Sequence, residues 1–290
     1  MSLVKFEILQ KVAELKSFTK AADALGLTQS AVSHAITSLE SEFGFRLIFR
    51  NRSAIELTRE GETLLPSIRQ VLYDHEKVRQ EAAGILGLTR GTVRAGVFTS
   101  VSKHWLPQII QIMEQKYPHI QIELREGNYA DIEQGILNGK LDCGFINVYG
   151  SSPLHIVPLK KDRMLCVVSN SSSLYHQSVV SLKQIEQEPF IMPAFGGNHE
   201  VKRIFTENHI QPKIRFELLE ETAILAMIRH HLGISILPEM VLPQTLSPLK
   251  AIPLETDSFR TLGLAIQIHP SPAAKKFVAI TKHLLMNNES

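Results

Sequence analysis

The pattern of apolar and polar residues near the N-terminus has the period of short amphipathic helices. It predicts three helices, over 3–16, 18–25 and 29–43. Ser17 and Thr28 immediately precede the second and third of these segments, where a hydroxyl can cap a helix N-terminus. Gly26 can adopt the left-handed conformation that ends the second helix. The second and third helices are therefore expected to meet at a tight turn.

The third predicted helix has two faces of different character. Val32, Ile36 and Leu39 recur at i, i+4 and i+7 and are expected to face inward. The opposite face carries small polar side chains and a histidine, namely Ser30, Ser33, His34 and Thr37. Two helices joined by a tight turn form a DNA-reading motif when the second helix has such a polar face. Considered alone, the same face would also suit a helix surface in contact with water.

Short extended segments follow, and then one long helix. The runs 45–49 and 55–58 flank a polar turn, which is typical of a β-hairpin wing. This region is rich in arginine and holds the single acid Glu56; its arginines are Arg46, Arg50, Arg52 and Arg59. An amphipathic helix over 59–86 has charged flanks, so pairing with a copy of itself fits it better than burial in a core. Residues 86–91, with two glycines, form a predicted hinge.

From residue 92 onward, strand and helix patterns alternate. The predicted strands are 92–98, 120–124, 143–146, 164–169, 190–192, 214–218, 234–237 and 262–268. The predicted helices are 102–116, 130–138, 199–208, 221–231 and 272–286. Such alternation is typical of parallel sheets with helices on both faces. We expect two α/β lobes that meet near residue 160, with a ligand cleft at their strand ends.

These patterns divide the chain into four parts. We expect a winged helix-turn-helix domain over 1–61 and a linker or dimerisation helix with a hinge over 62–90. The first lobe is expected over 91–161 plus 268–290, and the second over 162–267.

Composition narrows the function classes. With 290 residues, of which 44% are hydrophobic and 21% charged, the chain is long enough for two or three globular domains. Its net charge is only +2, so an argument for nucleic acid must rest on local clusters of basic residues. Two cysteines without CxxC spacing fit a reducing compartment. We see no signal peptide and no apolar run long enough to span a membrane, and we expect a cytoplasmic protein.

Many of these residues resemble the LysR-type transcriptional regulators. The N-terminal matches are Phe18-Thr19-Lys20-Ala21-Ala22, Leu25, Gln29-Ser30-Ala31-Val32-Ser33, Ile36, Leu39-Glu40, Gly44, Leu47, Arg50, Leu57-Thr58 and Gly61. The later matches are Trp105-Leu106-Pro107, Tyr117-Pro118, Leu141-Asp142, Gly233-Ile234 and Leu237-Pro238. The chain departs from the family pattern at Ile48, where phenylalanine is common, and at the wing tip, where Ala54 replaces a common glycine. Thr37 and Ser38 replace residues that are often basic, which shifts recognition toward the wing.

The resemblance implies an α/β protein with an N-terminal winged helix-turn-helix, a long linker helix and a two-lobed effector domain of periplasmic-binding-protein type. It implies a ligand-responsive regulator that binds a dyad-symmetric site on double-stranded DNA as a homodimer or homotetramer. A small-molecule effector would bind between the lobes, and RNA polymerase would be a further partner during activation. We expect no cofactor, no metal and no membrane partner.

Two groups of residues are candidates for DNA contact. Those on the recognition helix, which can hydrogen-bond base edges or phosphates, are Gln29, Ser30, Ser33 and His34. Those suited to phosphates, on the wing and at the N-terminus of the second helix, are Arg50, Arg52, Thr19 and Lys20. Surface ion pairs and simple helix capping are the alternative roles for the second group.

Polar residues gather where the predicted strands end. The candidates for effector binding are Thr99, Ser100, Ser102, Asn128, Asn147, Phe195, Gly196 and Thr222. Amides and hydroxyls at the 99–102 turn suit a carboxylate or another anion, and the resemblance places ligand contacts at this turn. Helix capping or turn formation would explain each residue equally well on its own.

Two other functions stay open from the residues alone. Residues 91–290 could form a solute receptor, although such proteins are often exported and no signal peptide is evident. An enzyme with an α/β cleft is the second alternative, but His199-Glu200 lacks the second histidine of a zinc protease motif, and His230-His231 are adjacent on a helix. Cys143 and Cys166 lie in apolar strands and are expected to be buried and unreactive.

Overall fold

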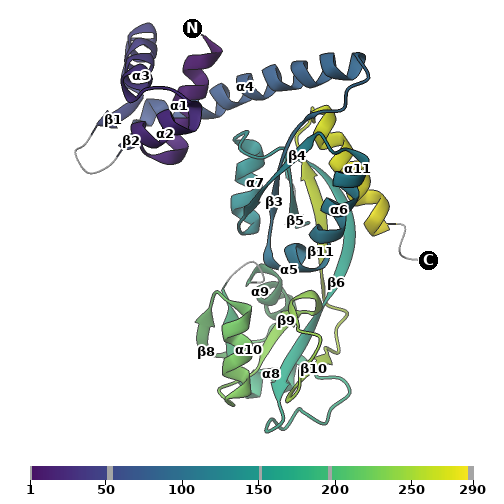
Figure 1. Cartoon of the computed structure of the whole chain (residues 1–290). Coiled ribbons are helices and arrows are strands. Elements are labelled where there is room, and N and C mark those ends of the chain that lie inside the picture. The colour runs from purple at the N-terminus through teal and green to yellow at the C-terminus, as the bar shows by residue number, and fades with distance from the viewer. Residues whose placement is uncertain (1, 51–54, 150–151, 195–197, 287–290) are drawn as a thin grey trace.

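The structure is a computed structural model that describes residues 2–50, 55–149, 152–194 and 198–286. A small helical domain lies at one end, a long helix runs from it, and two α/β lobes follow one below the other (Figure 1). No helix in the described part of the chain combines the length and hydropathy that crossing a bilayer requires.

The N-terminal domain has the three helices that the sequence predicts. They are α1 (Leu3–Leu15), α2 (Phe18–Leu25) and α3 (Gln29–Phe43). The hydroxyl of Ser17 accepts a hydrogen bond from the amide of Lys20, and that of Thr28 accepts one from Ala31, so both capping predictions are confirmed. Gly26 ends α2 in the left-handed conformation, with φ 65°.

A two-stranded wing connects this domain to the long helix. Strands β1 (Ile48–Arg50) and β2 (Ile55–Leu57) pair antiparallel, and α4 (Arg59–Ile85) begins directly after them. The side chain of Glu40 on α3 accepts the amides of Leu47 and Ile48 at 2.9 and 3.2 Å. The Thr58 hydroxyl caps α4 through the amide of Gly61 and donates to the carbonyl of Arg46. These bonds join the wing to α4 at a corner around Thr58.

The long helix α4 packs on the first lobe at the start of α11 (Pro272–Met286). The Tyr73 hydroxyl accepts the amide of Ser271 at 2.7 Å, and Gln80 Oε1 accepts that of Ala273 at 3.1 Å. These amides lie at the N-terminal end of α11, where the first amides of a helix have no carbonyl partner within the helix. The linker helix α4 therefore supplies part of the N-terminal cap of α11.

Lobe I is built on a mixed sheet. Its elements are β3 (Gly91–Val97), α5 (Thr99–His104), α6 (Leu106–Lys116), β4 (Ile120–Glu126), α7 (Tyr129–Leu137), β5 (Cys143–Asn147), β11 (Phe259–Ile266) and α11. Strand β3 pairs parallel with β4 and β5, whereas β11 runs antiparallel to β5. The single helix expected over 102–116 is two helices, because the backbone turns at Trp105 and Pro107 suits the first turn of a new helix.

Lobe II begins in the second half of β6 (His155–Ser169), a long strand that both lobes share. Its other elements are α8 (Leu182–Gln187), β7 (Pro189–Pro193), α9 (Asn198–Glu207), β8 (Lys213–Leu218), α10 (Glu221–Arg229), β9 (Ser235–Pro238), a 3-10 turn (Glu239–Val241) and β10 (Leu249–Pro253). The sequence analysis missed α8 and β10, which are too short to show a clear period.

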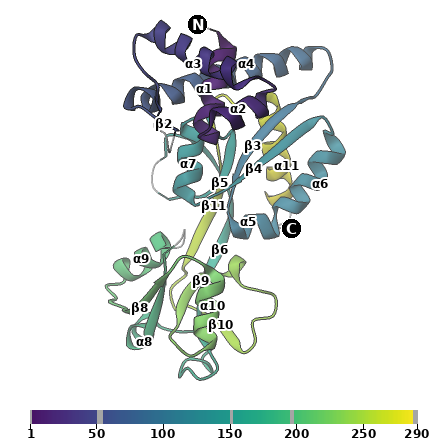
Figure 2. The same cartoon turned by 60° about the vertical axis from the view of Figure 1, so that its left-hand side comes forward.

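The two lobes are joined by β6 and β11 (Figure 2). The first half of β6 pairs with β11, and its second half pairs with β9 and β10. Because β11 also pairs with β5, residues 259–266 lie in the sheet of lobe I. The range of 162–267 expected for the second lobe is therefore corrected at its C-terminal end, since an apolar strand pattern does not reveal its partner strand.

The N-terminal domain and each of the two lobes have an apolar core, and the two cysteines lie within the cores of the lobes. Cys143 and Cys166 are fully buried. Burial raises the pKa of the Cys166 thiol to about 12 and raises that of Cys143 well above its ordinary value. Both thiols stay protonated near neutral pH, which agrees with the prediction that they are unreactive.

Two glycines of α4 give a matched test of the corner between wing and helix. A Cβ on Gly61 would lie 2.3 Å from the carbonyl oxygen of Leu47, whereas one on Gly84 would meet nothing within 4 Å. We expect Gly61→Ala to lower the free energy of unfolding by about 1–3 kcal/mol. Gly84→Ala should raise it by about 0.5–1 kcal/mol. Urea denaturation of both variants measures this, and equal effects would contradict the packing described.

Candidate nucleic-acid interface and inter-lobe site

The recognition-helix candidates lie on the outer side of α3. Val32, Ile36 and Leu39 are 0% exposed and anchor the helix in the N-terminal core. On the other side, Gln29, Ser30 and His34 are exposed and Ser33 is half-buried. The polar groups thus face away from the core at the start of the helix, where a groove of duplex DNA could receive them.

The phosphate candidates are only partly described. Thr19 and Lys20 are exposed in the first turn of α2, next to backbone amides that favour an anion. Arg50 is the last residue of β1, and its side chain lies outside the described part of the structure. Arg52 lies outside the described residues altogether.

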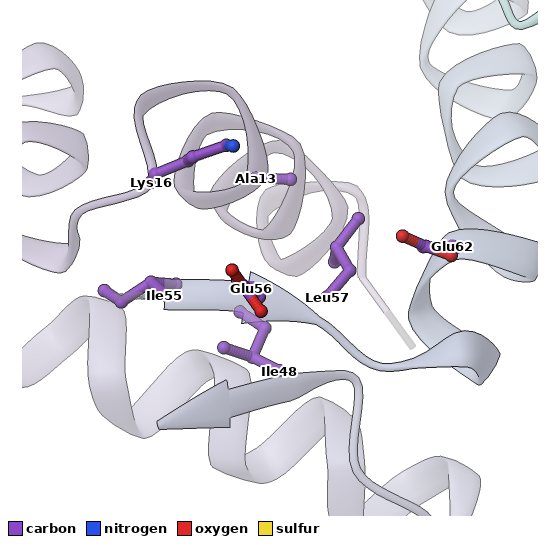
Figure 3. Close-up of a pocket in the computed structure, with 7 residues that line it drawn as sticks. All are labelled: Ala13, Lys16, Ile48, Ile55, Glu56, Leu57 and Glu62. Atoms are coloured by element: carbon purple, nitrogen blue, oxygen red, sulfur yellow. The ribbon is translucent and has the colours of Figure 1, made fainter. Parts of the chain in front are cut away.

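A pocket of about 390 Å³ lies between the wing and α1. Its lining does not favour a phosphate. Figure 3 shows Lys16 and Glu62 on opposite sides of the pocket, with Leu57 of β2 between them. Glu56 also lines the pocket. Two carboxylates against one ammonium group disfavour an anion here, so the nucleic-acid candidates remain those on the other elements.

A buried guanidinium organises the region where the lobes join. Arg260 on β11 is 4% exposed, and its Nε and Nη2 donate to Asp162 Oδ2 at 2.8 and 2.7 Å. Its Nη1 donates to the Tyr129 hydroxyl at 2.8 Å and its Nη2 to the Ser100 hydroxyl at 3.0 Å. Burial lowers the pKa of Arg260, but its interactions with Tyr129 and Asp162 outweigh this and leave the pKa raised. Burial raises the pKa of Tyr129 to about 12.

Several effector candidates have partners within the protein. Ser100 is 2% exposed and accepts the bond from Arg260. Thr99 donates to Glu126 at 3.3 Å, and Asn128 caps α7 by accepting the amide of Asp131 at 2.8 Å. The alternative roles in capping and packing therefore apply to these three.

The other candidates are distributed over both lobes. Asn147, at the end of β5, donates through Nδ2 to Glu200 on α9, so a side chain of each lobe takes part in one contact. Ser102 is half-buried on α5, and Thr222 is exposed in the first turn of α10. Phe195 and Gly196 lie outside the described residues.

Sequence reasoning missed four residues of this region, namely Tyr129, Asp162, Glu200 and Arg260. A signal was present for two of them, because Asp162 and Arg260 each place a charge in a strand that continues into an apolar run. Opposite charges in two such strands indicate a buried pair. Glu200 was considered only as part of a metal motif, and within the described ranges no three His, Cys, Asp or Glu side chains gather closely enough to hold a metal ion.

Two parts of the chain match family models. Residues 3–62 match the model described as bacterial regulatory helix-turn-helix protein, lysR family, and residues 86–285 match the LysR substrate binding domain. The chain belongs to the LysR family of transcriptional regulators. This LysR-family protein is therefore a DNA-binding regulator with an effector-binding domain, and not an enzyme.

Similar proteins agree with this assignment. The uncharacterised HTH-type transcriptional regulator YvbU of Bacillus subtilis is 33% identical over 289 residues, covering 98% of this chain and 99% of YvbU. A full-length variant of OxyR from Pseudomonas aeruginosa has a TM-score of 0.80 at 20% identity, covering 98% and 95% of the two chains. Full-length CbnR complexed with its target DNA has a TM-score of 0.67 at 21% identity, covering 98% and 99%. The two solved structures show that the LysR-family fold is shared.

The buried ion pair has an exposed neighbour that serves as a control. Arg260→Met should lower the free energy of unfolding by about 3–5 kcal/mol, because it leaves Asp162 buried and without its cation. Arg163 binds Glu239 at the surface, with side chains 63% and 48% exposed, and Arg163→Met should cost less than about 1 kcal/mol. Chemical denaturation compares the two; similar losses would mean that the Arg260 cluster is not what holds the strands.

Proposed function

We propose that this protein is a ligand-responsive regulator that binds a dyad-symmetric promoter site as a homodimer or homotetramer and responds to a small molecule held between its lobes. The observation that carries the proposal is the construction of α3, whose apolar side is fully buried while Gln29, Ser30 and His34 are exposed. This arrangement leaves the polar side chains available to a DNA groove.

An apolar stripe on α4 supports self-association. Leu64, Val71, Val78 and Ile85 recur every seven residues, which puts them on one side of the helix. Val71, Val78 and Ile85 are 46%, 62% and 87% exposed. Pairing with a second copy would cover this stripe and place two recognition helices on a site with twofold symmetry.

The DNA contacts follow from the positions of the candidates. Gln29, Ser30, Ser33 and His34 would face base edges and nearby phosphates, while Thr19 and Lys20 would hold a phosphate at the N-terminus of α2. Arg50 and Arg52 would hold the backbone beside the wing. The sum of these contacts gives an affinity that falls with rising salt concentration.

The effector proposal rests on residues of both lobes, Thr99, Ser100, Ser102, Asn128, Asn147 and Thr222. The contact between Asn147 and Glu200 supports it, because a ligand in this region would alter a bond that spans the lobes. A ligand changes the arrangement only if it binds one arrangement more tightly than another. The attachment of α4 to lobe I through Tyr73 and Gln80 offers a direct connection to the N-terminal domain. We also infer a cytoplasmic location, contact with RNA polymerase during activation, and no cofactor besides the effector.

Salt dependence of DNA binding tests the interface. Lys20→Ala should weaken binding to specific and random duplexes alike and reduce the slope of log affinity against log salt by about one, because one phosphate contact is lost. Gln29→Ala should instead leave the slope unchanged and reduce discrimination between sequences by about 1–3 kcal/mol. Fluorescence anisotropy at several salt concentrations measures both quantities.

Lys183→Ala, at an exposed position of α8 in lobe II, is the control for loss of a positive charge and should change neither quantity. If wild-type protein binds no promoter fragment, or if Lys183→Ala has the same effect as Lys20→Ala, the proposed interface is wrong.

Self-association has its own test. Val78→Glu places a charge in the apolar stripe and should lower the mass at micromolar concentration by at least a factor of two in analytical ultracentrifugation. Val179→Glu changes a comparably exposed valine of lobe II, 47% exposed, and should leave the mass unchanged. A wild-type protein that is monomeric, or a Val78→Glu variant of unchanged mass, would contradict pairing through α4.

A further inference from the structure

A second cavity lies between the N-terminal domain and lobe I. It has a volume of about 580 Å³, which is in the range of small-molecule sites. Its walls come from α1, from α4 and from β3, β4 and α7 of lobe I. Figure 2 shows α1 above this part of lobe I. None of the effector candidates lines this cavity, although Glu126 and Asp131 at its edge bind Thr99 and Asn128.

Arg69 of α4 lines this cavity and is buried there. The residue is 6% exposed, and its Nε has no hydrogen-bond partner among the described residues. Within the same part of the chain, it forms no ion pair, and the opposite charge that acts on it is that of Glu14 on α1. Burial lowers the pKa of Arg69, and Glu14 offsets only part of this. A buried guanidinium that lacks a partner is costly, and such groups usually bind an ion or a water.

The surrounding charges also favour an anion. The basic lining residues are Lys11, Lys16, Arg69, Arg94, Arg125 and Lys140, and the acidic ones are Glu14, Glu123, Glu126 and Asp131. Two of the acids pair with bases of the same lining, Glu14 with Lys11 at 3.2 Å and Glu123 with Arg94 at 3.6 Å. These pairs leave four basic residues against Glu126 and Asp131, so the cavity keeps an excess of positive charge for a ligand.

We propose that this cavity binds a small anion, the phosphate or carboxylate group of a metabolite, with the Arg69 guanidinium as its central donor. A guanidinium presents a planar fork of N–H groups that fits two oxygens of either group. Lys16, which directly follows α1, and Arg125 on β4 supply further positive charge from the two sides of the cavity.

Binding of an anion here would favour the arrangement in which the N-terminal domain lies against lobe I. The cavity is formed by both parts, and α4 approaches lobe I so closely that a Cβ on Gly139 would lie 3.2 Å from the Cβ of Arg69. A ligand held by both parts stabilises their contact and shifts the population toward it. The anion would thus be a second input to the regulator, separate from a ligand between the lobes.

The test uses the full chain without DNA, so that it does not depend on the proposed interface. Inorganic phosphate and citrate are titrated separately into the protein by calorimetry at constant ionic strength. We expect saturable binding of at least one of them, and the better ligand tells whether phosphate or carboxylate chemistry is preferred. Arg69→Met should weaken that binding at least about tenfold, because a charge-assisted hydrogen bond is lost.

Two further variants make the result specific. Arg79→Met removes an exposed arginine of the same helix, with its side chain 66% exposed, and should leave the affinity unchanged. Glu14→Gln removes the negative charge that acts on Arg69 and should tighten binding severalfold. The proposal is overturned if neither anion binds saturably, if Arg69→Met binds as tightly as the wild type, or, should Arg69→Met fail to fold, if Glu14→Gln does not bind more tightly.

Discussion

One buried guanidinium holds together the two strands that connect the lobes. The chain passes between them on β6 and β11, and at this crossing Arg260 binds Asp162 on the neighbouring strand. The same group reaches Tyr129 and Ser100, which begin the helices above it. Inside a protein such a pair is stable only when both partners and their hydrogen bonds are present. The direction in which the strands leave lobe I is therefore fixed by charge as well as by backbone pairing.

The linker helix is attached to lobe I by hydrogen bonds between uncharged groups and carries exposed apolar residues on its other side. Tyr73 and Gln80 bind amides at the start of α11, whereas Val71, Val78 and Ile85 are exposed. A single helix can thus contact its own lobe and offer an apolar surface to a second copy. A displacement of lobe I would move both surfaces of α4, because the helix is continuous.

Local chemistry explains which parts could be predicted from the sequence. The caps at Ser17 and Thr28 depend on residues three positions away, and both helices begin as expected. The partner of β11 and the role of Arg260 depend on contacts across long separations, such as the 160 positions between Ser100 and Arg260. Ser100 was therefore recognised as a polar group at a strand end, while the residue that holds it was not.

The corner around Thr58 determines how a movement of α4 would reach DNA. Its hydroxyl joins the carbonyl of Arg46 to the amide of Gly61, and Glu40 of α3 binds the amide of Leu47 in the same segment. The recognition helix α3, the wing and the start of the linker helix α4 are therefore held together as one unit. In the proposed dimer, control exerted through the linker would leave base recognition by each N-terminal domain intact and change the separation and tilt of the two domains. The base pairs between the half-sites of the proposed dyad-symmetric site would then have to bend or straighten in response.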